Sequence, residues 1–98
     1  VSISAFAGPL SEQVRVIGEA VNPLAVNYTQ NMTLLDLMIA VGGLTEFADG
    51  NSAKLVRVLN GKKVTFSLKI DDLIRDGDIT QNVDILPGDV VIIPEAWL

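Results

Sequence analysis

The stretch that decides the fold is Leu86-Pro87-Gly88-Asp89-Val90-Val91-Ile92-Ile93-Pro94, near the end of the chain. A Pro-Gly-Asp turn signal precedes four consecutive β-branched apolar residues, and such an unbroken run is typical of a strand buried on both faces. A strand of this kind lies between other strands, which excludes a simple meander whose last strand is at an edge. We expect its parallel neighbour to be Val14-Arg15-Val16-Ile17-Gly18, near the other end of the chain.

The segments between these two strands complete one small sheet. In chain order we expect a first hairpin at 12–18 and 24–28, a helix at 33–41, a second hairpin centred on Asn60-Gly61, a short helical turn at 71–75 and the final strand. The order is therefore ββαββ, short helix, β. A chain whose two ends pair in one mixed sheet, with one main helix packed on it, has the β-grasp (ubiquitin-like) arrangement, an α+β fold.

The expected helix carries its own start and stop signals. Its apolar residues have the i, i+3, i+4, i+7 spacing of an amphipathic helix: Leu34, Leu37, Met38 and Val41. Thr33 and Asp36 have the spacing of a capping box. Gly42-Gly43 follows the last apolar position, where one glycine is expected in the left-handed conformation that ends many helices. The pair is not a phosphate-binding loop, because such glycines precede a helix.

The register of the second hairpin follows from which positions are apolar. On the second arm these are Val64, Phe66, Leu68 and Ile70, and on the first arm the core candidates are Val56 and Val58. A two-residue Asn60-Gly61 loop would pair Arg57 with Val64 and place a charge in the apolar layer. We therefore predict a three-residue loop at 59–61, with Gly61 left-handed and followed by a bulge.

Composition restricts the function more than it identifies it. The chain has 98 residues, 49% of them hydrophobic, which is enough for one domain with its own core. Residues 1–12 are interpreted as a linker or the end of a preceding domain, and residues 13–98 as the domain. Cysteine and histidine are absent, so the usual general base and the commonest transition-metal ligands are missing. We expect no enzyme activity and no cofactor.

The net charge of −5 argues against a nucleic-acid partner, since neutralising phosphates requires a basic surface. No segment approaches the roughly 20 apolar residues of a membrane-spanning helix. A cluster of acidic and amide residues at 76–84 lacks the EF-hand pattern with its terminal glutamate, so turn and cap roles are favoured over calcium binding. We therefore predict no metal site.

Charge is distributed unevenly along the chain. Five of the seven basic residues fall on or beside the second hairpin: Lys54, Arg57, Lys62, Lys63 and Lys69. A block of aspartates follows, which suggests a head-to-tail contact between the basic hairpin of one copy and the acidic region of the next. The candidate interface residues are Lys54, Arg57, Lys62, Lys63, Asp76 and Asp78. The alternative to a contact is that the basic residues form a solvated strand face and the aspartates cap turns and helices. Charges on such a strand also protect a sheet edge from aggregation.

Aromatic residues, on which sugar rings usually stack, are few. The candidate ligand contacts are Tyr28, Glu46 and Phe47. Phe47 has an alternative role as a plug of the hydrophobic core. Trp97, beyond the last strand, is expected to pack on a neighbouring domain.

An ordered set of short segments resembles a known family. The segments are Val14-Arg15-Val16-Ile17-Gly18-Glu19, Asn22-Pro23, Met32-Thr33-Leu34-Leu35-Asp36, Val41-Gly42-Gly43-Leu44-Thr45, Asp71-Asp72-Leu73-Ile74 and Pro87-Gly88-Asp89 with the following residues to Pro94. Together they resemble the soluble-ligand-binding β-grasp (SLBB) domain over about residues 12–98. More narrowly, they resemble this domain in periplasmic polysaccharide export proteins that accompany exosortase (PEP-CTERM) systems, where the motifs at 43–48 and 76–78 recur.

This resemblance implies a non-catalytic module of a bacterial exopolysaccharide exporter, with no cofactor. Its partners would be other copies of the exporter in a periplasmic ring, a neighbouring export domain and the exopolysaccharide in transit. The full-length protein would be periplasmic and associated with the outer membrane, and only that longer protein would contact the membrane. The alternative function is a binding module for a saccharide or another small molecule.

Overall fold

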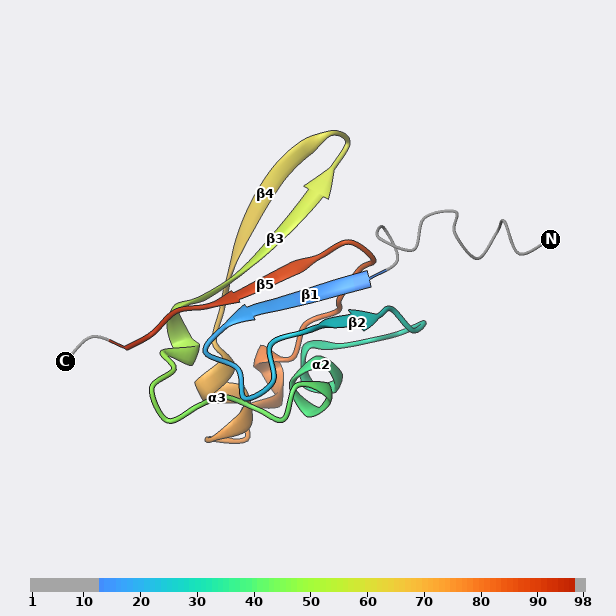
Figure 1. Cartoon of the computed structure of the whole chain (residues 1–98). Coiled ribbons are helices and arrows are strands. Elements are labelled where there is room, and N and C mark those ends of the chain that lie inside the picture. Colours follow the sequence, from blue (N-terminus) through green and yellow to red (C-terminus); the bar gives the residue numbers. More distant parts are fainter. Residues whose placement is uncertain (1–12, 97–98) are drawn as a thin grey trace.

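The structure is a computed structural model, and it describes residues 13–96 of the chain. The expectations for residues 1–12 and for Trp97 lie outside the described residues. Five strands form one mixed sheet in the order β2-β1-β5-β3-β4 (Figure 1). Their bounds are Gln13–Gly18 for β1, Ala25–Asn27 for β2, Ala53–Leu59 for β3, Lys62–Leu68 for β4 and Val90–Ile93 for β5.

Strand β5 lies at the middle of the sheet, as its sequence predicts. It pairs in parallel with β1, where Arg15 is opposite Val90 and Ile17 is opposite Ile92. On its other side it pairs antiparallel with β3. Both ends of the described chain thus meet in the centre of one sheet, which confirms the predicted α+β, β-grasp arrangement.

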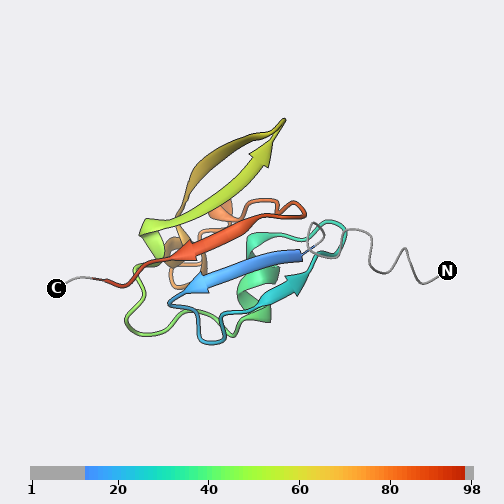
Figure 2. The ribbon, with the colours of Figure 1, turned by 45° about the horizontal axis from the view of Figure 1, so that its top comes forward.

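The helices lie on one side of the sheet (Figures 1 and 2). They are α2 (Leu34–Ala40), α3 (Ile70–Ile74) and the short 3₁₀ helices η1 (Gly50–Ser52) and η2 (Ile79–Gln81). Helix α3 is the short helical turn that the sequence predicts before the final strand. The molecule therefore has two layers, a sheet and a helical layer.

The ends of α2 confirm the predicted caps. The Thr33 side chain accepts a hydrogen bond from the Asp36 backbone, and the Asp36 side chain accepts one from the Thr33 backbone. At the other end Gly42 and Gly43 both have positive φ. Their N–H groups donate to the carbonyls of Ile39 and Met38, the two crossed hydrogen bonds of a Schellman motif. Only glycine adopts these left-handed angles without strain, so the helix ends here.

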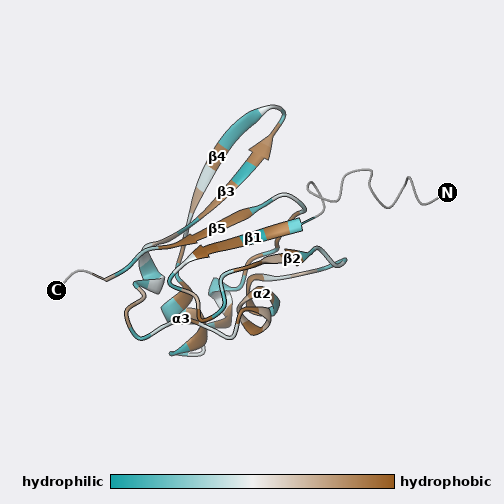
Figure 3. Ribbon diagram, in the orientation of Figure 1, coloured by the Kyte–Doolittle hydropathy of each residue, from teal (hydrophilic) through white to brown (hydrophobic). Residues whose placement is uncertain are grey.

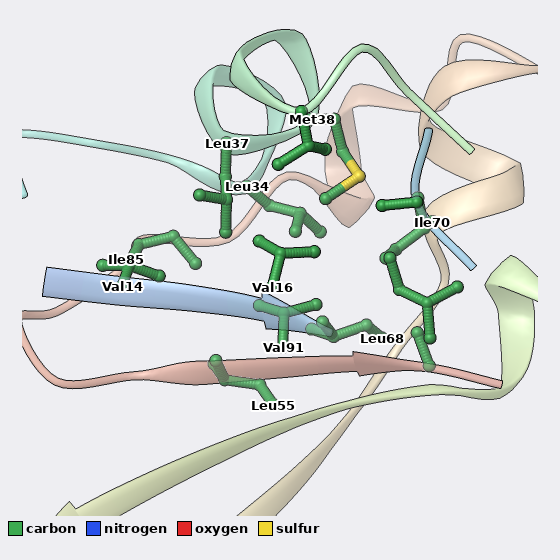
Figure 4. Packing of buried hydrophobic residues seen from close by; sticks show 14 of the residues in the cluster. Val14, Val16, Leu34, Leu37, Met38, Leu55, Leu68, Ile70, Ile85 and Val91 are labelled. Atoms are coloured by element: carbon green, nitrogen blue, oxygen red, sulfur yellow. The ribbon is translucent and has the colours of Figure 1, made fainter. Parts of the chain in front are cut away.

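The hydrophobic core lies between α2 and the centre of the sheet (Figure 4). Leu34, Leu37 and Met38, from the predicted stripe of α2, are buried. They face Val16 of β1 and Val91 of β5. Each fully buried side chain of this size contributes about 1.5–3 kcal/mol. A seven-residue helix is too short to be stable alone, so this packing holds α2 in place.

The prediction that β5 is buried on both faces is only half correct. Val91 and Ile93 point into the core and are buried, whereas Val90 and Ile92 point to the opposite side and are half-buried. All described helices lie on the core side, so the second face of the strand is covered only by its neighbours within the sheet. The strand is central, but its outer face is apolar and open.

The predicted three-residue hairpin loop is wrong. Leu59 pairs with Lys62, so the loop is the two-residue Asn60-Gly61 turn, and both turn residues have positive φ. This register pairs Arg57 with Val64 on the core side of the sheet. The prediction excluded it because a charge in the apolar layer is costly, but a buried carboxylate neutralises Arg57, as described below.

The same register corrects the core residues of the hairpin. Leu55 is buried, while the two predicted core residues Val56 and Val58 point to the open side of the sheet. Phe66 is on the core side as predicted, yet 39% of it is exposed. The outer half of the hairpin extends beyond the helical layer, and its strands alternate between hydrophobic and hydrophilic residues (Figure 3). This hairpin is thus the part of the sheet least supported by the core.

Candidate functional site

A buried ion pair joins the hairpin to the turn before β5. Asp89, at the end of the Pro-Gly-Asp turn, is only 1% exposed. Arg57 donates from Nη2 to Asp89 Oδ2 at 2.8 Å and from Nε to Oδ1 at 3.0 Å, a bidentate pairing. The Leu86 N–H also donates to Oδ2 at 2.8 Å. These hydrogen bonds with Asp89 raise the pKa of Arg57, while burial acts in the opposite direction.

The Arg57 guanidinium makes two further contacts. Its Nη2 donates to the backbone carbonyl of Asp84 at 3.1 Å, and its central carbon lies 5.4 Å from the centre of the Phe66 ring, within cation–π distance. One side chain therefore ties both strands of the hairpin, β3 and β4, to the loop at 84–89, which is distant in sequence. These hydrogen bonds come from Nε and Nη2 of Arg57.

A cleft of about 320 Å³ lies beside this ion pair, between the hairpin and the loop before β5. Leu55, Leu68 and Val83 make it largely apolar, Phe66 contributes an aromatic ring, and Arg57 contributes the guanidinium. An aromatic ring next to a charged hydrogen-bond donor is a combination that binds polar ligands with apolar faces.

The predicted interface residues do not all share one surface. Lys54 and Lys63 are exposed on the open side of the sheet, whereas Lys62 is on the core side of the hairpin, near its tip. Arg57 is committed to Asp89 and is not a free surface charge. Two of the four predicted basic residues therefore remain together on one face.

The predicted acidic residues lie in the other layer. Asp76 follows α3, and Asp78 precedes η2, whose first turn it caps. The backbone and side chain of Thr80 donate hydrogen bonds to Asp78, which lowers the pKa of Asp78 below its ordinary value of 3.8. The acids are thus in the helical layer, whereas the exposed lysines Lys54 and Lys63 point to the opposite side of the sheet. Figure 1 shows these two layers.

The predicted ligand contacts are not gathered into one site. Tyr28 follows β2 and packs partly against the core, at the end of the sheet where β1 begins. Glu46 and Phe47 belong to the loop between α2 and η1, and the Phe47 carbonyl accepts a hydrogen bond from Ala96 beyond β5. The two places lie at opposite ends of the sheet (Figures 1 and 2). Phe47 is 59% exposed, so its alternative role as a core plug is wrong.

Sequence reasoning missed Phe66, which lines the cleft, and Asp89, which pairs with Arg57 beside it. The sequence pattern places Asp89 in a turn signal and Phe66 in the core. A signal for Asp89 was present: Arg57 is the one charged residue in the apolar pattern 55–59, and an arginine there requires a partner. Which acid it pairs with depends on the fold, since 32 positions separate the two residues.

Within residues 13–96 no group of three or more acidic, histidine or cysteine side chains is placed to hold a metal ion. No described helix is long and apolar enough to cross a membrane.

The two-layer arrangement, with β1 and β5 parallel at the centre of the sheet and a capped helix packed on it, defines the class of β-grasp proteins. A family model for the SLBB domain matches residues 12–93. The chain therefore belongs to the SLBB domain family. Membership of this family suggests a ligand-binding module of the kind found in polysaccharide export proteins.

Proposed function

We propose that this chain is the SLBB module of a bacterial exopolysaccharide exporter of the exosortase type. In this function the module contributes to a periplasmic ring and to translocation of the polysaccharide, in a full-length protein associated with the outer membrane. The observation that carries the proposal is the ordered set of motifs, which resembles this branch of exporters and lies within the region matched to the SLBB family. Other copies of the exporter, a neighbouring export domain and the transiting polymer would be its partners.

A non-catalytic role agrees with how the acidic side chains are used. Asp71 accepts a hydrogen bond from the Gly50 N–H at 3.1 Å, and Asp72 accepts one from the Asn51 amide at 3.1 Å. These adjacent acids thus fasten η1 to α3. A glycosidase instead needs two carboxylates facing each other across a substrate.

A second function, binding of a saccharide or another small molecule, is favoured by one observation. The cleft beside Arg57 and Phe66 offers an aromatic surface, a guanidinium and a volume of about 320 Å³ in one place. Among residues 13–96, Phe66 is the one aromatic residue that lines this cleft, so the stacking surface for a sugar ring is small and such binding would be weak. Weak binding suits a polymer in transit.

The exporter function is tested by replacing residues 13–96 with a flexible linker in the bacterial gene that encodes the chain. We expect loss of extracellular polysaccharide while the polymer still accumulates in the cell. Unchanged export would contradict the proposal. Titration of the chain with oligosaccharides, followed by NMR, separates the two functions. Saturable shifts confined to the cleft residues favour a receptor, and concentration-dependent association without such shifts favours a scaffold.

A further inference from the structure

The sheet has an open face, which consists of the side chains that point away from the helical layer. Its apolar residues are Ile17, Val56, Val58, Val90 and Ile92. Residues paired directly across neighbouring strands share a face, and these pairs place the five side chains in adjoining rows: Ile17 beside Ile92, and Val90 beside Val56. Val58, at one end, is 67% exposed. An apolar surface of this kind marks an interaction site.

The charged side chains that the strands place on the open face are basic. Arg15, Lys54 and Lys63 point to this side, because they pair with Val90, Ile92 and Val58 respectively. The strands β1 to β5 contribute no acidic residue to either face. The open face is therefore apolar along its centre and basic around it.

The helical layer presents the opposite charge. Between Ile70 and Asp84 there are five aspartates and one basic residue, Arg75, which is itself paired with Asp71 at 3.4 Å. Exposed apolar side chains accompany these acids. Ile39 of α2 and Ile79 of η2 are exposed, and an apolar hollow of about 280 Å³ lies between α2 and Ile74. We refer to this surface, with Ile39, Ile74, Asp76, Asp78 and Ile79, as the helical face.

We propose that the open face of one copy of this chain binds the helical face of the next copy. The inference rests on the proposed function and names the contact through which ring neighbours meet. The two faces are complementary in charge and both have apolar centres. They also lie on opposite sides of the molecule, so each copy uses a different face toward each neighbour. Such a heterologous contact closes into a ring when the rotation between copies is suitable.

The strand register distinguishes this contact from one made by the whole hairpin, because it decides on which face each lysine lies. Lys62 and Lys63 are adjacent, exposed and equally charged, but Lys63 is on the open face and Lys62 is on the other side of the hairpin. The proposal therefore assigns Lys63 to the interface and leaves Lys62 outside it. Arg57 is also outside, because Asp89 holds it.

Sedimentation of the purified chain at high concentration and low salt measures this contact. We expect self-association that weakens as salt is added, since the Debye length falls. Replacing Lys54 and Lys63 by glutamate should weaken it about tenfold, because attraction becomes repulsion at the rim. The matched control K62E should leave association unchanged. An equal loss in K62E, or a chain that is monomeric under all these conditions, would overturn the proposal.

Mixing variants tests whether the two faces differ. K54E/K63E and D76K should each associate poorly alone, because the first has an acidic open face and the second has a helical face with less negative charge. Together they should form a heterodimer, in which the acidic open face of the first meets the helical face of the second, where D76K has replaced a repelling carboxylate by a cation. Asp76 is chosen because Asp78 caps η2. If mixing the two variants does not increase their association, the proposal is overturned.

Cross-linking gives an independent readout, since the chain has no cysteine of its own. The double variant T65C/I79C carries one cysteine on each face, both at exposed positions. Oxidation should convert it into a ladder of linked chains. The control pair T65C/E46C, with its second cysteine in the loop after α2, should remain unlinked, because Glu46 lies outside the proposed contact. A ladder in the control, or no ladder in T65C/I79C, would refute the contact, and the export assay above would still judge the proposed function separately.

Discussion

The central strands and the β3–β4 hairpin belong to one sheet but are stabilised differently. Around β1 and β5 the core-facing side chains Val16 and Val91 are buried against α2. In the outer half of the hairpin, beyond Leu55, side chains are half-buried or exposed on both faces. There the connection to the rest of the protein depends largely on one ion pair, Arg57 with Asp89. Stability is therefore uneven, and the hairpin is the region expected to open first.

The largest effect is expected in the core. Replacing Leu37 by alanine should lower the free energy of unfolding by about 3–5 kcal/mol, because it opens a cavity between α2 and the sheet. Chemical denaturation measures the loss. Leu35→Ala, the same change in the exposed part of the same helix, should cost less than about 1 kcal/mol. Equal costs would mean that α2 does not pack as described.

A smaller effect, with a different pattern, is expected at the ion pair. Arg57→Met leaves the buried Asp89 carboxylate without its arginine and should cost about 2–3 kcal/mol. Hydrogen exchange should show the greatest loss of protection in β4, since the hairpin loses its connection to the turn at 86–89. Lys62→Met, on the same hairpin, is the control and should change neither quantity. A uniform loss of exchange protection over the whole sheet would contradict the conclusion that the hairpin and the central strands differ in stability.

The hairpin turn is expected to have a smaller and more local effect. Gly61 has a φ of 79°, so Gly61→Ala should cost about 1 kcal/mol. Gly61→Asn should cost less, because asparagine tolerates left-handed angles. Exchange of the β3 and β4 amides should accelerate in the alanine variant, while that of β1 remains unchanged. Equal exchange in the two variants would argue against strain at this position.

The smallest effect concerns the cap of η2. The pKa of Asp78 lies below its ordinary value of 3.8 because Thr80 donates hydrogen bonds to the carboxylate. Because the pKa of Asp78 is lower in the folded state than in the unfolded state, its carboxylate stabilises the folded state at pH values above the ordinary pKa. This contribution is lost as the pH falls through the folded-state pKa. An NMR titration of the Asp78 carboxyl group should give a midpoint below 3.8 in the native chain. In Thr80→Ala the midpoint should rise, and a constant midpoint would exclude Thr80 as the cause.

Some of these features were predictable because they depend on neighbouring residues. The helix stripe, the capping box of Thr33 and the Gly42-Gly43 terminus are local patterns, and the structure contains all of them. The central position of β5 also followed from its four β-branched residues. Such a run is stable only when strands flank it on both sides.

The hairpin register was not predictable in the same way. The local pattern disfavoured a charge opposite Val64, and only the folded chain brings Asp89 to Arg57. The predicted ligand contacts failed to gather for a related reason. Tyr28 and Phe47 are aromatic residues outside the predicted core, and residue type does not determine which end of a sheet a loop occupies.

The sequence by itself determined the order of the elements, the caps of α2 and the pairing of the first and last strands. These follow from backbone conformational preferences and from the spacing of apolar side chains. The tertiary structure alone decided that Arg57 is neutralised by Asp89, and that the basic and acidic surfaces lie on different layers. Those outcomes depend on distances between residues far apart in the chain, and the distances exist only after the layers have packed.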